Sequence, residues 1–506
     1  MNIKHFGIGA MLALAGCAPK TEQKAPNIIF ILADDLGYGD ISALNPESKI
    51  ITPNIDRIAR NGVTFTDAHS NSSVSTPTRY GILTGRYAWR TPLKAGVLNG
   101  YSKAMIPQDR TTMAGMLQQQ GYHTACFGKW HLGWDWANID AGIDNIDYSR
   151  PITNGPITLG FDYFYGFSGS LDMPPYVYVE NDMPTALPDR LTVGNNIPVG
   201  REGSDGSFWR EGPTGSDFDH LDCQPNLNRR VIKYIGEKAR SKQPFFVYYP
   251  MPSPHTPILP TEEFQGKSGL NTYADFVLMV DKMVGDIIDA LEKNGILDNT
   301  ILVFTADNGC SPWADFPFLL EHGHNPNYVF RGAKADLYEG GHRVPCVVQW
   351  PARIEPQVIN QTICLIDFMA TFAEISGYSL QDNEAEDSFS LLPALLDANN
   401  NELIREATVH HSINGDFSIR TGKWKLLLAP GSGGWSFPRP GDEPDGAPSV
   451  QLYDVIADVG ETVNLQDQYP EVVKELKALL TKYINDGRST PGAIQKNEGE
   501  FPWRQL

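Results

Sequence analysis

The chain has 506 residues and a formal net charge of −19, with 41% hydrophobic and 20% charged residues. This length and composition exclude a disordered chain and predict one large domain with a smaller one beside it. Because the net charge is strongly negative and no basic stripe is available to neutralise phosphates, nucleic acid is excluded as a partner. It also repels polyanions at long range, which means that an anionic ligand needs a locally positive pocket.

The N-terminus is predicted to be a targeting segment. An apolar run over residues 6–16 is too short to span a membrane in the mature protein. The run ends in Leu-Ala-Gly-Cys at Cys17, which resembles a bacterial lipobox. This implies a lipoprotein signal peptide over residues 1–17, a tether over 18–25 and a lipid on the Cys17 sulfur. We therefore expect a lipid-anchored protein of the bacterial cell envelope, periplasmic or at the cell surface; a plain signal peptide cut nearby is the alternative.

The first predicted strand leads directly into acidic residues. Residues 27–33 are almost all apolar, which is typical of a strand buried on both faces of a parallel sheet. Asp34 and Asp35 follow at its end. Two adjacent carboxylates in such a place favour a hard divalent cation with oxygen ligands. A solvated turn fits the same residues, because Asp and Gly are common in turns.

The stretch from Ser75 to Arg86 carries the most specific pattern. A helix over 54–61 and a strand over 63–66 are expected before it. Pro77 fixes the backbone at the start of a short helix, and Gly85 suits a left-handed helix end. Ser75 then lies at a helix N-terminus, which favours anions, and Arg79 can grip an oxyanion. A Ser/Thr-rich loop that caps an ordinary helix is the alternative.

The run Ser-Thr-Pro-Thr-Arg at residues 75–79, followed by Leu-Thr-Gly at 83–85, resembles the signature of the type I sulfatases. These enzymes form part of the alkaline phosphatase superfamily. The resemblance implies that Ser75 is oxidised to formylglycine, whose hydrated aldehyde is the nucleophile. It also implies a partner, because serine-type members need a sulfatase-maturing enzyme that works anaerobically. Arg79 is then expected to help hold the sulfate.

The next predicted helix, 111–120, and strand, 124–127, lead to Lys129 and His131. If the strand continues, these two side chains lie on one face. There they can bind an oxyanion and transfer protons, although a salt-bridged lysine and a core histidine are the alternative. The string Gly-Lys-Trp-His-Leu-Gly also resembles the sulfatases. The resemblance implies that Lys129 binds sulfate and that His131 helps to release it.

Residues 134–220 are rich in Gly, Pro, Asp and aromatic side chains, with weak periodicity. Such long irregular insertions are usually functional loops or lids. The candidate substrate contacts here are Asp172, Trp209 and Arg210. The alternative is that the aromatic residues only hold the insertion together.

A helix over 226–241 and a strand over 244–249 precede the loop Pro-Ser-Pro-His-Thr-Pro around His255. The flanking prolines fix the position of this histidine. A lone loop histidine is often incidental. In the sulfatases, however, a histidine in this setting lies over the scissile sulfate, so the resemblance implies that His255 is the acid that protonates the leaving group.

A predicted helix over 273–294 and strand over 300–305 lead to Asp307 and Asn308. In a doubly wound sheet, sites form at the carboxyl ends of strands, so these residues should meet Asp34 and Asp35. Four such oxygen ligands suit one Ca²⁺ ion. No Cys or His cluster lies with them in the sequence, which weighs against a zinc-dependent phosphatase.

Lys334 begins a pattern of Lys, four residues and Glu-Gly-Gly that again resembles the sulfatases. The resemblance implies a second sulfate-binding lysine; an ordinary surface lysine is the alternative. His322 and His324 precede it in a loop that we expect to face the sugar.

The C-terminal part changes to short alternating runs. A strand over 346–350 and a helix over 367–376 complete the large domain, and strands at 408–411, 417–421, 424–428 and from 452 precede a helix over 470–485. We predict an α/β fold. Residues 26–400 form a large domain with helices on both faces of a mostly parallel sheet, and 401–506 form a smaller α+β subdomain with an antiparallel sheet.

The resemblance extends from about residue 27 to 465 and implies a carbohydrate sulfatase with one Ca²⁺ ion and a formylglycine. A sulfated oligosaccharide is the expected substrate. Similarity to animal N-acetylgalactosamine-6-sulfatases favours a 6-O-sulfated galactose or N-acetylgalactosamine, and a sulfate at O4 or another position stays open. Two alternatives are a phosphatase or phosphodiesterase of the same superfamily and a non-catalytic glycan-binding lipoprotein.

Overall fold

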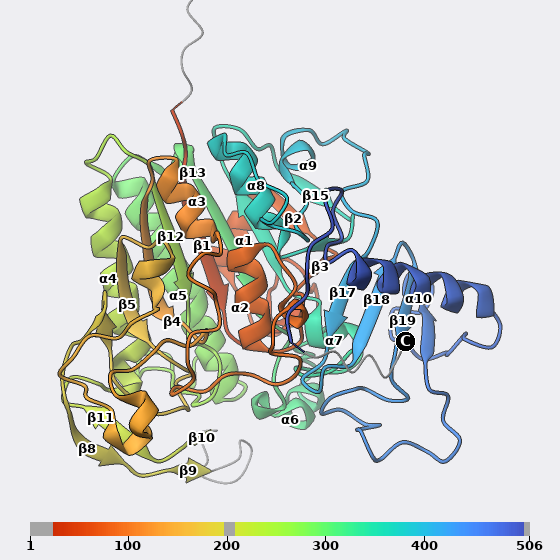
Figure 1. The fold of residues 1–506 in the computed structure, drawn as a ribbon, viewed down its shortest axis with the longest axis horizontal. Coiled ribbons are helices and arrows are strands. Elements are labelled where there is room, and N and C mark those ends of the chain that lie inside the picture. The colour runs from red at the N-terminus through yellow and green to blue at the C-terminus, as the bar shows by residue number, and fades with distance from the viewer. Residues whose placement is uncertain (1–23, 197–207, 500–506) are drawn as a thin grey trace, which may run out of the picture.

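The computed structural model describes residues 24–196 and 208–499 (Figure 1). Its centre is a ten-stranded sheet in the order β15-β2-β14-β13-β1-β12-β4-β5-β6-β7. The predicted signal peptide and Cys17 lie outside the described residues. Within the described residues, no helix combines the length and the apolar character that a membrane crossing needs.

Five neighbouring parallel strands form the middle of this sheet. They are β13 (Thr300–Ala306), β1 (Asn27–Ala33), β12 (Phe245–Pro250), β4 (His123–Lys129) and β5 (Tyr163–Phe167). Their apolar side chains belong to the main core, as the near-continuous hydrophobic runs predict. All five run in the same direction, so their carboxyl ends form one edge of the sheet.

Two groups of helices cover the sheet. In one group, α5 (Thr272–Lys293) contacts α1 (Pro53–Arg60) and α4 (His220–Lys238). In the other, α2 (Ser75–Thr84), α3 (Met113–Gln119) and α8 (Asp367–Ser376) contact one another. The ring of Phe368 in α8 packs edge-on against Phe30 of β1, with centroids 5.2 Å apart. The predicted large sheet surrounded by helices is confirmed.

A second, four-stranded antiparallel sheet lies toward the C-terminus, drawn in blue in Figure 1. Its strands are β17 (Thr408–His411), β18 (Phe417–Thr421), β19 (Trp424–Leu427) and β20 (Gln451–Asp454), and α10 (Pro470–Asn485) contacts it. Leu476 and Leu480 of α10 share a core with Tyr87 and Trp89 of the large domain. The predicted small antiparallel sheet with a helix is therefore confirmed; the predicted boundary at residue 400 stays a prediction.

Two parts of the large sheet differ from the sequence prediction. Strand β14 (Cys346–Gln349) is antiparallel to both β13 and β2 (Val63–Phe65), and β6 (Val179–Glu180) is antiparallel to β5, so the sheet is mixed on both sides of its parallel centre. Residues 134–220, which show weak periodicity in the sequence, supply β5, β6 and β7 (Met183–Pro184). Strands β6 and β7 are too short to show a period of two, so only their pairing reveals them.

Helix α4 begins six residues before its predicted start. The Asp219 side chain caps it by accepting a hydrogen bond of 2.9 Å from the Leu221 backbone N–H. Pro225 is the sixth residue of α4, just past the four N–H groups that lack a partner in any helix, so the helix forgoes one backbone hydrogen bond there. The remaining elements are β3 (Ala68–His69), β8 (Pro188–Thr192), β9 (Asn195–Asn196), β10 (Phe208–Trp209), β11 (Gly212–Gly215), β15 (Gln357–Ile359), β16 (Ile363–Cys364), α6 (Phe316–Glu321), α7 (Glu339–His342) and α9 (Leu392–Leu396).

Candidate active site

The predicted site residues meet at the carboxyl ends of the central strands. Asp34 follows β1, Asp307 follows β13 and Lys129 is the last residue of β4. Ser75 is the first residue of α2, which ends at Gly85 with φ of 62°, as its sequence predicts. The loop after β12 carries His255, and the Asp34 N–H donates to the Ser253 carbonyl at 3.0 Å.

Ser75 lies beside a buried ion pair. Its hydroxyl donates to Asp34 Oδ1 at 3.3 Å, and Lys129 Nζ lies 3.4 Å from Ser75 Oγ and 2.6 Å from Asp34 Oδ2. Burial lowers the pKa of Lys129. Burial alone would raise the pKa of Asp34, but the charges of Lys129, His255 and Arg79 outweigh it and hold that pKa below its usual value.

Arg79 lies in the same helix as Ser75 and contacts carboxylates. Its Nη2 is 2.8 Å from Asp307 Oδ2 and 3.5 Å from Asp34 Oδ2, and its Nη1 donates to the Lys129 carbonyl at 3.1 Å. The guanidinium is fully buried. These contacts tie α2 to β4 and to the end of β13, and the direct grip of Arg79 on an oxyanion stays a prediction.

The acidic residues form an oxygen-rich group. The Asp35 N–H donates to Asp307 Oδ1 at 3.1 Å, and Asn308 Nδ2 donates to Asp35 Oδ1 at 2.7 Å. Asn308 Oδ1 is buried and accepts no hydrogen bond from the described residues. Asp34 and Asp35 with His255 also have the mutual spacing of metal ligands. Carboxylate oxygens beside an unpaired amide oxygen fit a hard divalent cation, as predicted for these residues.

Two residues of the site have left-handed backbone conformations. Asp35 has φ of 61° and His131 has φ of 55°. Such conformations carry a free-energy cost for residues other than glycine, and they cluster at functional sites. Strand β4 ends at Lys129, so the turn at His131, rather than strand alternation, brings this histidine beside Ser75.

His131 is held as a neutral base. Its Nε2 donates to the Leu98 carbonyl at 2.7 Å, so the proton is on Nε2 and the lone pair on Nδ1. Nδ1 is buried and has no hydrogen-bond partner among residues 24–196 and 208–499. Burial first, and then the charges of Lys129 and Arg79, hold the pKa of His131 well below its usual value. A neutral imidazole with a free lone pair can accept a proton.

Lys334 and His255 lie near Asp35. Lys334 Nζ is 2.7 Å from the Asp35 carboxylate, and His255 Nε2 is 3.6 Å from Asp35 Oδ2. Burial lowers the pKa of Lys334, but Asp35 and Asp34 outweigh it, so the pKa is raised and the ammonium stays charged. His255 Nδ1 donates to the Thr256 carbonyl at 2.5 Å. Its Nε2 is therefore the atom available for proton transfer.

A close backbone approach holds the Lys334 segment in place. The Gly309 N–H donates to the Gly341 carbonyl at 2.9 Å. A Cβ atom on Gly309 would lie 1.8 Å from the Gly340 carbonyl oxygen, so no other residue fits there. The Gly-Gly that follows Lys334 and the Gly after Asn308 therefore bring the two segments together.

These residues surround a cavity of about 350 Å³, the first cavity. Ser75, His131, His255 and Lys334 line one part of it. Its remaining lining residues are Val74, Val97, Asp172, Met173, Phe208, Arg210, Thr256, Ser311, Trp313, Ile413 and Trp435. Apolar walls with a few charged groups are typical of a small-molecule site. Burial would raise the pKa of Asp172, but His255 and Arg210 outweigh it and lower that pKa.

The structure brings only some of the predicted substrate contacts to this cavity. Asp172 and Arg210 line it and form an ion pair with each other. Trp209 does not line it, because its indole N–H donates to the Val193 carbonyl at 2.8 Å.

The two histidines expected to face the sugar do not line the first cavity either. His324 is fully buried, with its Nε2 2.8 Å from Asp40. His322 is exposed and donates to the Phe318 carbonyl of its own helix. Both side chains are thus committed to their local structure, which corrects the expectation.

Three aromatic residues of the cavity were missed. Phe208 and Trp313 stack with ring centroids 5.5 Å apart, and Trp435 lies 5.9 Å from Lys334 Nζ. They come from three segments that are distant in sequence and too short or irregular to show periodicity. The one available signal was a tryptophan inside the Gly/Pro-rich stretch 431–449.

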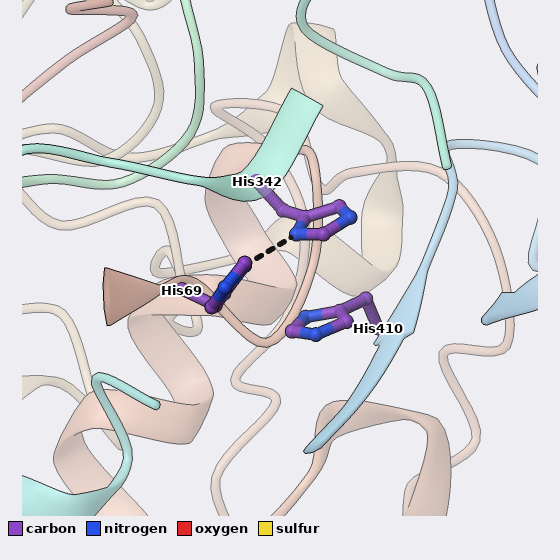
Figure 2. A group of neighbouring side chains, drawn as sticks. All are labelled: His69, His342 and His410. Carbon is purple, nitrogen blue, oxygen red and sulfur yellow. Dashed lines mark hydrogen bonds between the residues drawn. The ribbon is translucent and has the colours of Figure 1, made fainter. Parts of the chain in front are cut away.

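A second group of histidines lies where β3, α7 and β17 meet, with His69, His342 and His410 contributed by these elements in turn (Figure 2). His69 Nδ1 and His342 Nδ1 are 2.9 Å apart, while the His410 ring stacks parallel to His342 at 4.0 Å. Imidazole lone pairs lie in the ring plane, so two stacked rings do not converge on one ion. His410 also bonds the Ser70 carbonyl at 2.8 Å and Thr408 Oγ1 at 2.9 Å. These contacts make the group a structural joint.

The small sheet directly supports the segment that precedes Ser75. The Ser72 hydroxyl and the Ser73 N–H both donate to the His411 carbonyl of β17, at 3.0 Å and 3.2 Å. The Ala335 N–H donates to the Ser73 carbonyl at 2.9 Å. The segment before Ser75 is therefore held between β17 and the segment of Lys334.

The sulfatase family profile matches residues 26–378. The chain is 35% identical to an N-acetylgalactosamine-6-O-sulfatase of Bacteroides thetaiotaomicron, over 92% of this chain and 96% of that protein. It is 30% identical to human arylsulfatase A, over 99% of this chain and 96% of that protein.

A solved structure from a study of the metabolism of multiple glycosaminoglycans by Bacteroides thetaiotaomicron has a similar fold. It is 33% identical, has a TM-score of 0.78, and matches 91% of this chain and 99% of its own. Family, relatives and fold agree with the arrangement around Ser75: the chain belongs to the sulfatase family and is a sulfuric ester hydrolase.

Proposed function

We propose that this sulfatase removes a 6-O-sulfate from a galactose or N-acetylgalactosamine residue of a sulfated glycan. The observation that carries the proposal is the ring of Ser75, Lys334, His255 and His131 around one cavity, with Lys129 directly behind Ser75. The relative named N-acetylgalactosamine-6-O-sulfatase, at 35% identity, supports this choice of sugar and position.

The two lysines supply the positive charge that a sulfate ester needs. Lys129 Nζ is 3.4 Å from Ser75 Oγ, and Lys334 lines the same cavity. As a formylglycine, residue 75 supplies a hydrated aldehyde hydroxyl as the nucleophile. A Ca²⁺ ion held by Asp34, Asp35, Asp307 and Asn308 would neutralise charge on the sulfate. The lysines orient the ester and stabilise the charge that develops on its oxygens.

Two histidines then move protons. His255 Nε2 lines the cavity and, when protonated, donates to the sugar oxygen that leaves. His131 Nδ1 carries the free lone pair and accepts the proton of the remaining hydroxyl on residue 75. This second transfer releases sulfate and restores the aldehyde.

Mass spectrometry of the peptide across Ser75 tests the proposal, on protein made with a sulfatase-maturing enzyme. Conversion of serine to formylglycine removes two hydrogens, about 2 Da. We expect that loss, together with sulfate release from 6-O-sulfated galactose or N-acetylgalactosamine, and neither in Ser75→Ala. Turnover of a phosphoester by unmodified protein would favour the phosphatase alternative instead.

We also propose that the protein is anchored in the bacterial cell envelope by a lipid on Cys17. The apolar run that ends in Leu-Ala-Gly-Cys supports this. Full-length protein should partition into the detergent phase, and Cys17→Ser should partition into the aqueous phase. Equal partitioning of both would contradict the anchor.

A further inference from the structure

We propose that a second sugar subsite adjoins the active site and binds the sugar residue that is linked to the sulfated one. This inference rests on the proposed function, because it names a further part of the same substrate. It assigns the enzyme an oligosaccharide substrate in preference to a free monosaccharide.

The evidence is a second cavity of about 380 Å³, which shares a wall with the first. The two cavities have Val97, Met173 and Arg210 in common. Leu98, Asn99, Tyr101 and Pro174 complete the second cavity. These shared residues place the second cavity directly beside the one that contains Ser75. Both volumes lie within the range of small-molecule sites, about 300–1,000 Å³.

The lining of the second cavity suits a sugar ring. Tyr101 and Pro174 offer apolar faces, while Asn99 and Arg210 offer hydrogen-bonding groups. Tyr101 is half-buried, and within the described chain its hydroxyl has no hydrogen-bond partner. An aromatic face with a free polar tip matches the mixed character of a pyranose.

Arg210 lies where the two sugars would be joined. Its Nη1 pairs with Asp172 of the first cavity, and its guanidinium lies over the Phe208 ring at 5.0 Å. The side chain is still 51% exposed. Within the described residues, its Nε and Nη2 groups donate no hydrogen bond, so they are available to substrate oxygens.

Leu98, which lines the second cavity, also fixes the orientation of His131, the proposed base. The Leu98 carbonyl accepts the His131 Nε2 proton at 2.7 Å, and the Leu98 N–H donates to Thr76 Oγ1 at 3.1 Å. The Thr76 hydroxyl in turn donates to the His131 carbonyl at 3.0 Å. A sugar seated against residues 97–99 thus restrains the segment that orients His131. Occupation of the subsite should raise kcat as well as lower KM.

The test compares 6-O-sulfated N-acetylgalactosamine with two disaccharides that carry a neighbouring sugar on one side or the other. Rates are normalised to the formylglycine content measured by mass spectrometry. We expect kcat/KM to be about tenfold higher for one of the disaccharides. Tyr101→Ala should remove that preference and leave hydrolysis of the monosaccharide within about twofold.

A second variant covers the case in which Tyr101→Ala folds poorly. Asn99→Trp changes an exposed residue and fills the second cavity, so it should also remove the preference. Tyr469→Ala is the matched control, because Tyr469 is an exposed tyrosine that lines neither cavity. Equal kcat/KM values for all three sugars, or a preference that survives in both variants, would overturn the subsite. Modified protein that hydrolyses none of the sugars would overturn the proposed function itself.

Discussion

Lys129 Nζ lies 2.6 Å from Asp34 Oδ2, with both side chains fully buried. The same relationship recurs between Lys334 and Asp35, 2.7 Å apart. In each pair the carboxylate is a candidate metal ligand and the ammonium is a candidate sulfate ligand. When a cation and a sulfate bind together, the carboxylates can pair with the cation and the ammonium groups with the sulfate. No buried charge is then left unpaired, which favours joint binding of the two.

Removal of the divalent cation should abolish activity and lower thermal stability. The reason is that three buried carboxylates then rely on Lys129, Lys334 and Arg79 alone, and the buried Oδ1 of Asn308 has no partner among the described residues. Dialysis against EGTA followed by Ca²⁺ addition, monitored by calorimetry and sulfate release, checks this. Tm should rise with Ca²⁺ concentration as mass action requires.

Asn308→Leu should weaken the dependence of Tm on Ca²⁺, because leucine has a similar size to asparagine but supplies no oxygen ligand. Asn299→Ala, which lies outside the site, is the control and should respond like the wild type. A Tm that is independent of Ca²⁺ in the wild-type protein would rule out this cation site.

Lys129→Met should destabilise the protein and abolish turnover. It leaves the fully buried Asp34 without its ammonium partner, and breaking a buried pair in this way is worth about 3–5 kcal/mol. Ca²⁺ supplies a replacement charge, so the rise in Tm on adding Ca²⁺ should be larger than in the wild type. Lys103→Met, at an exposed lysine, should change neither quantity. An equal rise in both proteins would argue against Asp34 as a ligand.

His255→Ala should impair poor leaving groups more than good ones. Sugars need a proton on the leaving oxygen, and His255 Nε2 is the available donor. We expect a loss of about 10²–10⁴-fold in kcat on a sulfated sugar and a much smaller loss on an activated aryl sulfate. His322→Ala, at an exposed histidine outside the cavity, is the control. Equal losses on both substrates would contradict the acid role.

Much of the fold followed from the sequence because the core strands are long. The seven residues before Asp34, six of them apolar, and the run before Asp307 form strands within a residue of the predicted bounds. The direction of β14 was not predictable, because a buried apolar run looks the same in either orientation. Strands of two residues, such as β6, carry no periodic signal at all.

The site was predictable where motifs end at strand termini. Asp34, Lys129 and Asp307 meet because parallel strands bring their carboxyl ends together. The walls of the cavity were not predictable, since Phe208 and Trp313 come from short segments that lie far apart in the sequence. Arg79 shows the remaining limit: its motif places it beside the site, but only the structure shows that it faces carboxylates.

Buried neutral histidines should make the fold sensitive to acid. His411 of β17 is buried, and burial lowers its pKa from the usual 6.5 to about 4. The unfolded chain therefore binds a proton below pH 6.5 that the folded chain does not. The stability that depends on a neutral His411 is complete above pH 6.5 and is lost as the pH falls toward 4, by about 1.4 kcal/mol per pH unit.

His411→Gln should therefore flatten the loss of stability between pH 7.5 and 5.5, measured as the change in Tm by calorimetry. The backbone carbonyl that holds Ser72 and Ser73 is kept in this variant, so the fold should persist. His322→Gln provides the comparison, because that histidine is exposed. A wild-type slope in His411→Gln would mean that His411 is not the group whose protonation destabilises the fold, and would point to other histidines whose pKa values burial also lowers, among them His342 and His410.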